Sequence, residues 1–231
     1  MLSEKEQRMM RKTKVWHIIL GCIIGVIACF GITSCSSNSK SIEQDIRQPS
    51  EPLDSHDYFP LSIGNRWRYR VTERDYVGEY EYRIDRQLSR NGQLCFELRA
   101  EREGTNPAPM LYAVQEKGVV SYSGIFGSEA LNFDKPFIDL PTPLTTKAEW
   151  HWKGEISLRG GAVKMPRTFK SYFLGLENCT VPAGRFEDCI KIKRIVKSIG
   201  PRDTNIYWFA KDLGLVKMVL GSRTYELISY N

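Results

Sequence analysis

Hydrophobic and polar residues alternate with a period of two along residues 58–231. The pattern is clear in 67–71 (WRYRV), 80–84 (YEYRI) and 94–98 (LCFEL), where large apolar residues alternate mainly with charged ones. Successive side chains of a β-strand point to opposite faces, so this alternation predicts strands with one buried and one solvated face.

Further strands are predicted at 110–115, 119–125, 149–158, 167–176, 186–196, 204–210, 215–220 and 223–229. Turn residues separate the strands, among them Asn91-Gly92, which is typical of a two-residue hairpin, and Pro182-Ala183-Gly184. No stretch of 58–231 carries an apolar stripe of helical period. The region therefore predicts an all-β fold, a single curved antiparallel meander sheet or half-open barrel of about ten to eleven strands.

Large aromatic residues stand where these strands are expected to face inward. We expect them to fill the concave face of the sheet. They are Trp67, Tyr69, Trp150, Trp152 and Trp208. The longest predicted connection, 126–147, is rich in proline and apolar residues and is expected to cover an open end of the sheet.

Residues 1–34 follow a different pattern, in which cationic residues precede an almost wholly apolar run at 15–32. This order predicts a secretory signal peptide. The run ends at Ile32-Thr33-Ser34-Cys35, which resembles the lipobox of bacterial lipoproteins. The resemblance implies cleavage before Cys35, which becomes the new N-terminus with a diacylglycerol thioether and an N-acyl chain such as palmitate. Two or more acyl chains hold a protein stably on a bilayer. Ser36, in place of Asp at the next position, implies the outer membrane.

Three other interpretations of the leader remain. The run approaches the roughly 18 residues that a transmembrane helix needs, although His17 and several glycines weaken that reading. Cleavage before Cys29 also fits the lipobox but would leave an apolar tripeptide on the processed end. Cleavage before Cys22 is a poorer match.

The processed chain is expected to hold one domain and a tether. Residues 35–57 contain no aromatic residue and are rich in serine, proline and charge, so they predict a lipidated cysteine followed by a disordered tether. Residues 58–231 form the β domain.

Charge argues against nucleic acid as a partner. The formal net charge is +6, half of it in the leader, which has five Lys or Arg against two acidic residues. The remainder is spread along the chain without a basic block.

Cysteine usage predicts no metal or redox site, since there is no C-x-x-C motif. Beyond the leader and Cys35, the thiols are Cys95, Cys179 and Cys189. Cys179 and Cys189 flank a predicted hairpin turn, in a compartment that permits disulfides, so a disulfide between them is possible. Three small, partly buried thiols are the alternative.

The search for catalytic groups predicts that the protein is not an enzyme and uses no cofactor or metal. His151 is the only histidine of 58–231, and no G-x-S-x-G motif accompanies it. It lies between Trp150 and Trp152 and should face away from them, to solvent. Glu79 and Glu81 alternate along one strand face, where cross-strand ion pairs with arginines are the expected role.

Three motifs occur in order: FPLxxGNxWxY at 59–69, TVPAGxFxxC at 180–189 and YWFAxxxGLVK at 207–217. Together they resemble a group of uncharacterised bacterial exported proteins and lipoproteins. The resemblance implies a curved antiparallel sheet similar in outline to the half-open barrels of periplasmic lipoprotein carriers. It brings no catalytic residues.

These observations predict an outer-membrane-anchored lipoprotein of the cell envelope, facing the periplasm or the cell surface. Its β domain is expected to bind a hydrophobic ligand or an envelope partner without catalysis, and its lipid anchor binds the membrane. The alternative is a structural or assembly lipoprotein that packs on another envelope protein and holds no small ligand.

Overall fold

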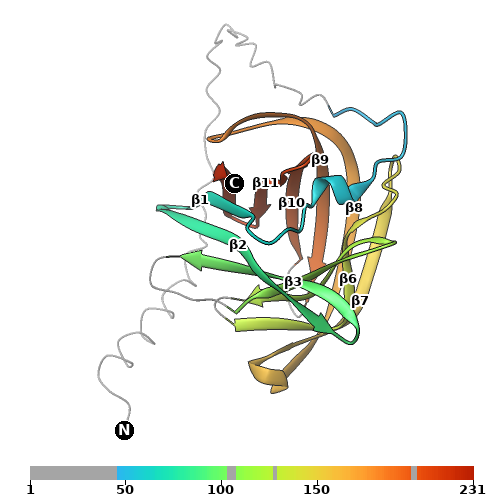
Figure 1. The fold of residues 1–231 in the computed structure, drawn as a ribbon, viewed down its shortest axis with the longest axis vertical. Coiled ribbons are helices and arrows are strands. Elements are labelled where there is room, and N and C mark those ends of the chain that lie inside the picture. Colours follow the sequence, from blue (N-terminus) through green and yellow to red (C-terminus); the bar gives the residue numbers. More distant parts are fainter. Residues whose placement is uncertain (1–45, 103–107, 127–128, 199–201) are drawn as a thin grey trace, which may run out of the picture. The chain divides into compact units, whose positions relative to one another are not determined.

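The computed structural model describes residues 46–102, 108–126, 129–198 and 202–231. They form twelve antiparallel strands in a closed barrel, in which each strand pairs with its neighbours in sequence (Figure 1). The strands are β1 (Arg66–Glu73), β2 (Tyr76–Arg90), β3 (Gln93–Arg102), β4 (Met110–Gln115), β5 (Gly118–Phe126), β6 (Glu129–Pro141), β7 (Glu149–Leu158), β8 (Val163–Val181), β9 (Gly184–Lys197), β10 (Asp203–Ala210), β11 (Gly214–Leu220) and β12 (Arg223–Tyr230). Two short 3-10 helices, η1 (Ser55–Tyr58) and η2 (Arg159–Gly161), are the helical elements of these residues.

The leader and its lipobox, 1–35, lie outside the described residues. Within the described ranges, no helix has both the length and the apolar character needed to span a bilayer.

The predicted antiparallel all-β meander is confirmed, and the sheet closes completely. β12 pairs with β1 from Trp67 opposite Tyr230 to Glu73 opposite Arg223, so neither strand is left as a free edge. The strand that sequence reasoning missed is β6, which occupies most of the stretch expected to be a long connection. Pro136 and the inward Asp139 interrupt its apolar alternation, which hid the period of two.

The joint between β6 and β7 is unusual because the two strands share only two residue pairs. Farther along these strands, hydrogen bonds from side chains of β7 to carbonyl groups of β6 replace the backbone ladder. The indole Nε1 of Trp150 donates to the carbonyl of Ile138 at 2.9 Å, and Nε1 of Trp152 donates to the carbonyl of Lys135 at 3.2 Å. The barrel is thus closed at this joint partly by two tryptophan side chains.

Residues 46–58, here called the strap, lie against the barrel. Arg47 exchanges backbone hydrogen bonds with Leu176 of β8, and Leu53 exchanges them with Leu144, which follows β6. Gly175 allows this contact: its φ is +133°, and a Cβ there would lie 2.5 Å from the carbonyl oxygen of Arg47. The predicted disordered tether at 35–57 is therefore corrected for 46–57. Low apolar content could not reveal a segment that is held by backbone and polar side-chain hydrogen bonds.

The strap defines one end of the barrel, here called the strap end, which also carries the turns after β8 and β10 (Figure 1). The opposite end carries the turns after β1 and β11 and the helix η2. At the strap end, Tyr58 of η1 packs into a buried cluster. Its other members are Leu140, Leu144, Phe173, Ile190, Ile192 and Phe209. This end of the interior is closed by apolar packing.

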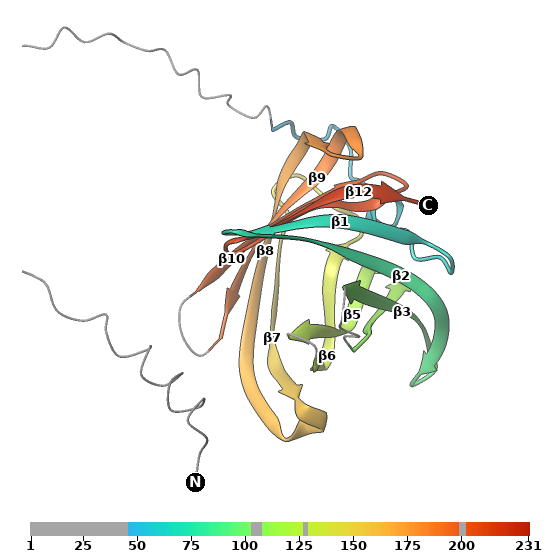
Figure 2. The same ribbon diagram turned by 90° about the vertical axis from the view of Figure 1, so that its left-hand side faces the viewer.

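The strands differ greatly in length, from six residues in β4 to nineteen in β8. Figure 2 shows β7 and β8 projecting beyond their neighbours at one end, while β8 and β9 do so at the other. All strands and buried clusters belong to one compact unit, Glu43–Asn231. The contacts that hold the strands and the buried clusters together therefore lie within this unit.

Candidate functional site

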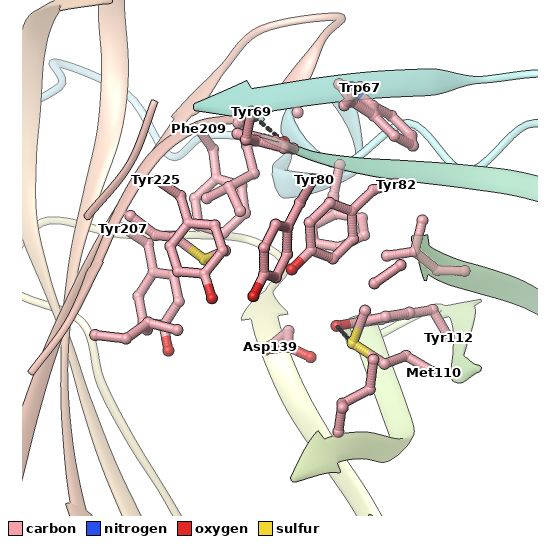
Figure 3. A pocket seen from close by; sticks show the side chains of 18 of the residues that line it. Trp67, Tyr69, Tyr80, Tyr82, Met110, Tyr112, Asp139, Tyr207, Phe209 and Tyr225 are labelled. Carbon is pink, nitrogen blue, oxygen red and sulfur yellow. Dashed lines mark hydrogen bonds between the residues drawn. The ribbon is translucent and has the colours of Figure 1, made fainter. Parts of the chain in front are cut away.

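The interior of the barrel holds a cavity of about 600 Å³, here called the aromatic lobe (Figure 3). Its lining runs from Phe59 and Gly214 near the strap end to Leu220 and Arg223 at the opposite end, and most of it is apolar. The aromatic lining residues are Phe59, Trp67, Tyr69, Tyr80, Tyr82, Tyr112, Tyr207, Phe209 and Tyr225. Its size lies within the roughly 300–1,000 Å³ typical of small-molecule sites.

Strand register explains why so many tyrosines meet in this lobe. Tyr69 of β1 lies opposite Tyr80 of β2, and Trp67 lies opposite Tyr82, so all four side chains share the inner face. Tyr69 and Tyr82 meet edge to face, with ring centroids 5.4 Å apart. Tyr80 meets Tyr225 of β12 in the same way at 5.7 Å.

The phenol groups give this apolar lobe a few oriented polar atoms. Figure 3 shows the hydroxyls of Tyr80, Tyr82 and Tyr225 pointing into the space, on the side of Asp139. The hydroxyl of Tyr69 instead donates to the carbonyl of Leu215 at 2.6 Å. Burial raises the pKa of Tyr69 and of Tyr82, so both remain neutral phenols at physiological pH.

A second cavity of about 560 Å³, here called the polar lobe, adjoins the first. It reaches the opposite end of the barrel at Gly221 and Ser222. The two lobes share lining residues from six strands, so they adjoin along this set of side chains. The shared residues are Tyr112, Ile125, Asp139, Arg194, Tyr207 and Leu220.

A buried ion pair lies where the lobes meet. Nη1 of Arg194 on β9 donates to Oδ1 of Asp139 on β6 at 3.0 Å, and Nη2 donates to the Asp139 carbonyl at 3.2 Å. The guanidinium also donates to Oγ of Ser171 at 3.1 Å and lies over the rings of Phe137 and Tyr207. Burial acts to lower the pKa of Arg194, but the Asp139 charge outweighs it, and the pKa is raised. Arg194 therefore stays charged inside the barrel.

Arg167 of β8 is a second cation in the polar lobe, and its situation differs. Its Nε is buried and has no hydrogen-bond acceptor among the described residues. No described carboxylate lies within 4.0 Å of its guanidinium. Burial lowers the pKa of Arg167, while the nearby charge of Asp203 acts in the other direction. Arg167 is thus partly buried, and its Nε lacks the kind of partner that Arg194 has.

Of the residues predicted for the concave face, some line the cavity and others do not. Trp67 and Tyr69 line the aromatic lobe. Trp150 and Trp152 face inward, but they fill the wall beside β6 and line neither lobe.

The prediction that Trp208 lies on the concave face is wrong. It lies on the face opposite to its neighbours Tyr207 and Phe209, which line the aromatic lobe. The Nζ atoms of Lys191 and Lys217 lie 5.1 and 5.9 Å from its ring centroid. Three consecutive aromatic residues fit either phase of a strand, so the sequence could not decide which of them face inward.

Sequence reasoning also missed several lining residues. Tyr80 and Tyr82 alternate as inward residues should, and that signal could have assigned them to the cavity. The pair formed by Asp139 and Arg194 had no such signal, because the two residues are 55 positions apart and Asp139 lies in the unrecognised strand.

The possible disulfide between Cys179 and Cys189 is also corrected, because both residues are free, buried thiols, as is Cys95. A register shift between β8 and β9 places Cys189 opposite Glu177 and Cys179 opposite Phe186, so the two cysteines are not cross-strand partners. Burial raises the pKa of Cys179 to about 11 and that of Cys189 to about 12. Both are therefore poor nucleophiles at neutral pH.

The remaining predicted polar residues lie outside the cavity. His151 is exposed and bonds Glu149 at 2.6 Å, which confirms that it faces away from its tryptophan neighbours. The expected ion pairing of Glu79 and Glu81 is confirmed by Arg68 at 2.5 Å and Arg66 at 3.4 Å respectively. In the described ranges, no three residues of metal-binding type come together.

Comparisons with known proteins give information on the fold alone. No protein-family model and no curated protein sequence matches the chain. Among solved structures, the chain is similar to a Bacteroides fragilis protein, provisionally described as exported and as having a YmcC-like fold. The identity is 14%, the TM-score is 0.54, and the match covers 75% of this chain and 98% of the other.

A second solved structure that resembles the chain is provisionally described as a lipoprotein of Parabacteroides distasonis. The identity is 16%, the TM-score is 0.48, and the match again covers 75% of this chain and 98% of the other. At such identities, the likeness to the Bacteroides fragilis protein establishes a shared fold and nothing about ligands.

Proposed function

We propose that this protein is a lipid-anchored binding protein of the cell envelope that holds a hydrophobic small molecule inside its barrel without chemically changing it. The observation that carries the proposal is the aromatic lobe, a 600 Å³ space with mostly apolar walls inside a closed sheet. A packed core leaves few voids larger than a water molecule, so a space of this size suits a ligand rather than a structural core.

The side chains around the lobe support binding rather than catalysis. Neither described histidine lies in it: His56 contacts Asp54 on the strap, and His151 lies outside the barrel. The thiols of Cys179 and Cys189 are buried outside the cavity lining. Burial raises the pKa of Tyr69 and Tyr82 and keeps them neutral, and the one carboxylate of the lobe, Asp139, is held by Arg194. These groups suit orientation of a ligand by hydrogen bonds.

The location rests on the leader. An apolar run followed by the lipobox at Cys35 supports export and acylation, and Ser36 supports the outer membrane. Mass spectrometry of the protein extracted from envelopes tests this. Diacylglycerol on Cys35 agrees with the proposal, whereas an unmodified thiol on a processed chain contradicts it.

The ligand proposal is tested with N-phenyl-1-naphthylamine, an uncharged probe that fluoresces in apolar surroundings, and with the folded unit Glu43–Asn231. Ala100 lines the aromatic lobe and is 3% exposed, so Ala100→Phe places a ring in the space. We expect the substitution to weaken probe binding by about tenfold or more, which corresponds to about 1.4 kcal/mol.

The same substitution at Ala162, which is exposed beside η2, is the matched control and should leave binding unchanged. Stability separates an open cavity from a filled one. Inserting a ring into a packed core costs about 1–3 kcal/mol, whereas an empty lobe accepts it with little loss. A strongly destabilised Ala100→Phe variant, together with a wild-type protein that does not bind the probe, would refute the proposal.

A further inference from the structure

Building on the proposed function, we infer that the ligand is an amphiphile with an acidic headgroup, whose apolar body lies in the aromatic lobe and whose headgroup is bound by Arg167 in the polar lobe. The headgroup chemistry is that of a carboxylate or a phosphate monoester. The interior is built in two chemically different parts, and only one ligand class matches both.

The first support is the state of Arg167. A buried guanidinium normally has a carboxylate or several acceptors around it, because desolvation of a charge is costly. Arg194 follows that rule, with Asp139, Ser171 and a main-chain carbonyl as acceptors. Arg167 has a buried Nε without an acceptor among the described residues. A ligand anion would supply what the chain does not.

The second support is the adjacency of the two lobes. They meet at the Asp139–Arg194 pair, beside Tyr112 and Tyr207. Arg167 lies beyond that junction, toward the opposite end of the barrel. A ligand whose apolar body lies in the aromatic lobe and whose head crosses this junction would place the head beside Arg167.

The third support is the balance of charge around the polar lobe. Its charged lining residues are Asp139, Arg194, Arg167 and Asp203. Asp139 is neutralised by Arg194, and Asp203 is exposed at the rim, where solvent screens it. Arg167 is the described cation of the interior that has no ion pair, since Arg223 of the aromatic lobe contacts Glu73. An anion entering the lobe therefore meets a net attraction at Arg167.

Replacement of Arg167 should affect stability differently from replacement of a structural arginine. A structural arginine stabilises the fold, so replacing it lowers the melting temperature. A ligand-binding arginine held without a partner costs stability in the empty protein, so Arg167→Gln should leave the melting temperature unchanged or raise it. The fluorescence measurement below is therefore made on a folded variant.

The test uses displacement of N-phenyl-1-naphthylamine from the unit Glu43–Asn231 by three competitors with the same twelve-carbon chain: dodecanoate, dodecyl phosphate and 1-dodecanol. Charge-assisted hydrogen bonds correspond to roughly tenfold or more in affinity, so at least one acid should displace the probe at concentrations about tenfold below those of the alcohol. Which acid is the stronger distinguishes a carboxylate ligand from a phosphate ligand.

Arg167→Gln should abolish the advantage of the acids and leave displacement by 1-dodecanol unchanged, while Arg167→Lys should retain part of the advantage. Arg159→Gln is the matched control, since Arg159 lies in η2 at the same end of the barrel with its side chain 70% exposed. Equal displacement by acids and alcohol from the wild-type protein would overturn the headgroup assignment and leave the proposed function intact. A wild-type protein that does not bind the probe would overturn both.

Discussion

The ion pair between Asp139 and Arg194 is expected to be costly to break. Its partners are 9% and 8% exposed, and their nearest charged atoms are 3.0 Å apart. Two unit charges at that distance attract each other by about 5 kcal/mol at an effective dielectric constant of about 20. Asp139→Asn removes the negative charge and keeps the side-chain volume.

The expected loss is smaller than the full attraction because Arg194 retains other partners. Ser171 and the main-chain carbonyl at position 139 still accept its hydrogen bonds, and two aromatic rings still flank it. Removing one partner of a buried pair costs about 3–5 kcal/mol, and we expect the low end, about 3 kcal/mol. For a chain of this size, that corresponds to a fall of about 6–12 °C in melting temperature.

Urea denaturation of the unit Glu43–Asn231 measures the difference in free energy of unfolding. The double variant Asp139→Asn with Arg194→Met completes the cycle. Because each single variant leaves one group unpaired, the double variant should lose less than the sum of the single losses, by about 1–3 kcal/mol. A single loss below about 1 kcal/mol, or additive losses, would refute the idea that the charges are coupled in a water-poor interior.

Two further predictions concern groups outside the cavity. At pH 7, Glu97→Gln should lower the free energy of unfolding by about 1–2 kcal/mol, because the carboxylate accepts hydrogen bonds from Arg86 and Arg99. Burial acts to raise the pKa of Glu97, but the two arginines outweigh it, and the pKa is lowered. This stabilisation is therefore present above the unfolded pKa of about 4.3 and is lost as the pH falls through the folded pKa. A loss of free energy of unfolding that is independent of pH in urea titrations would contradict the prediction. For the unit Glu43–Asn231, Ellman's reagent should react slowly with the native protein and then with all three thiols, Cys95, Cys179 and Cys189, in urea. One reactive thiol in urea would instead indicate a disulfide.

Local periodicity predicted the strands well because each strand buries one face. The predictions for 110–115 and 149–158 match β4 and β7 to the residue, and most others differ by one or two residues at each end. β2 and β8 are exceptions, since they extend well beyond the predicted 80–84 and 167–176 on both sides. The outer parts of β8 pair with β7 and β9 past the region of clear alternation, and pairing, unlike alternation, cannot be read from one strand alone.

The cavity could be predicted only in part. The inward phase of Trp67 and Tyr69 follows from alternation, but β6 carries a charged residue, Asp139, at an inward position, so the strand and its charge were both missed. Whether a barrel interior is filled or hollow depends on strand number and on the side chains that meet across it. Neither can be derived from single strands. For the same reason, the sequence does not distinguish Arg167 from the other charged residues of the chain.

The tryptophan bonds between β6 and β7 have a consequence for how the barrel can change over evolutionary time. Elsewhere, neighbouring strands are joined by amide groups that nearly every residue carries, so few substitutions alter the join. Here a replacement of Trp150 or Trp152 deletes a donor and spares every amide. The strength of the contact between β6 and β7 can thus change by substitution of these two residues while the rest of the fold is kept.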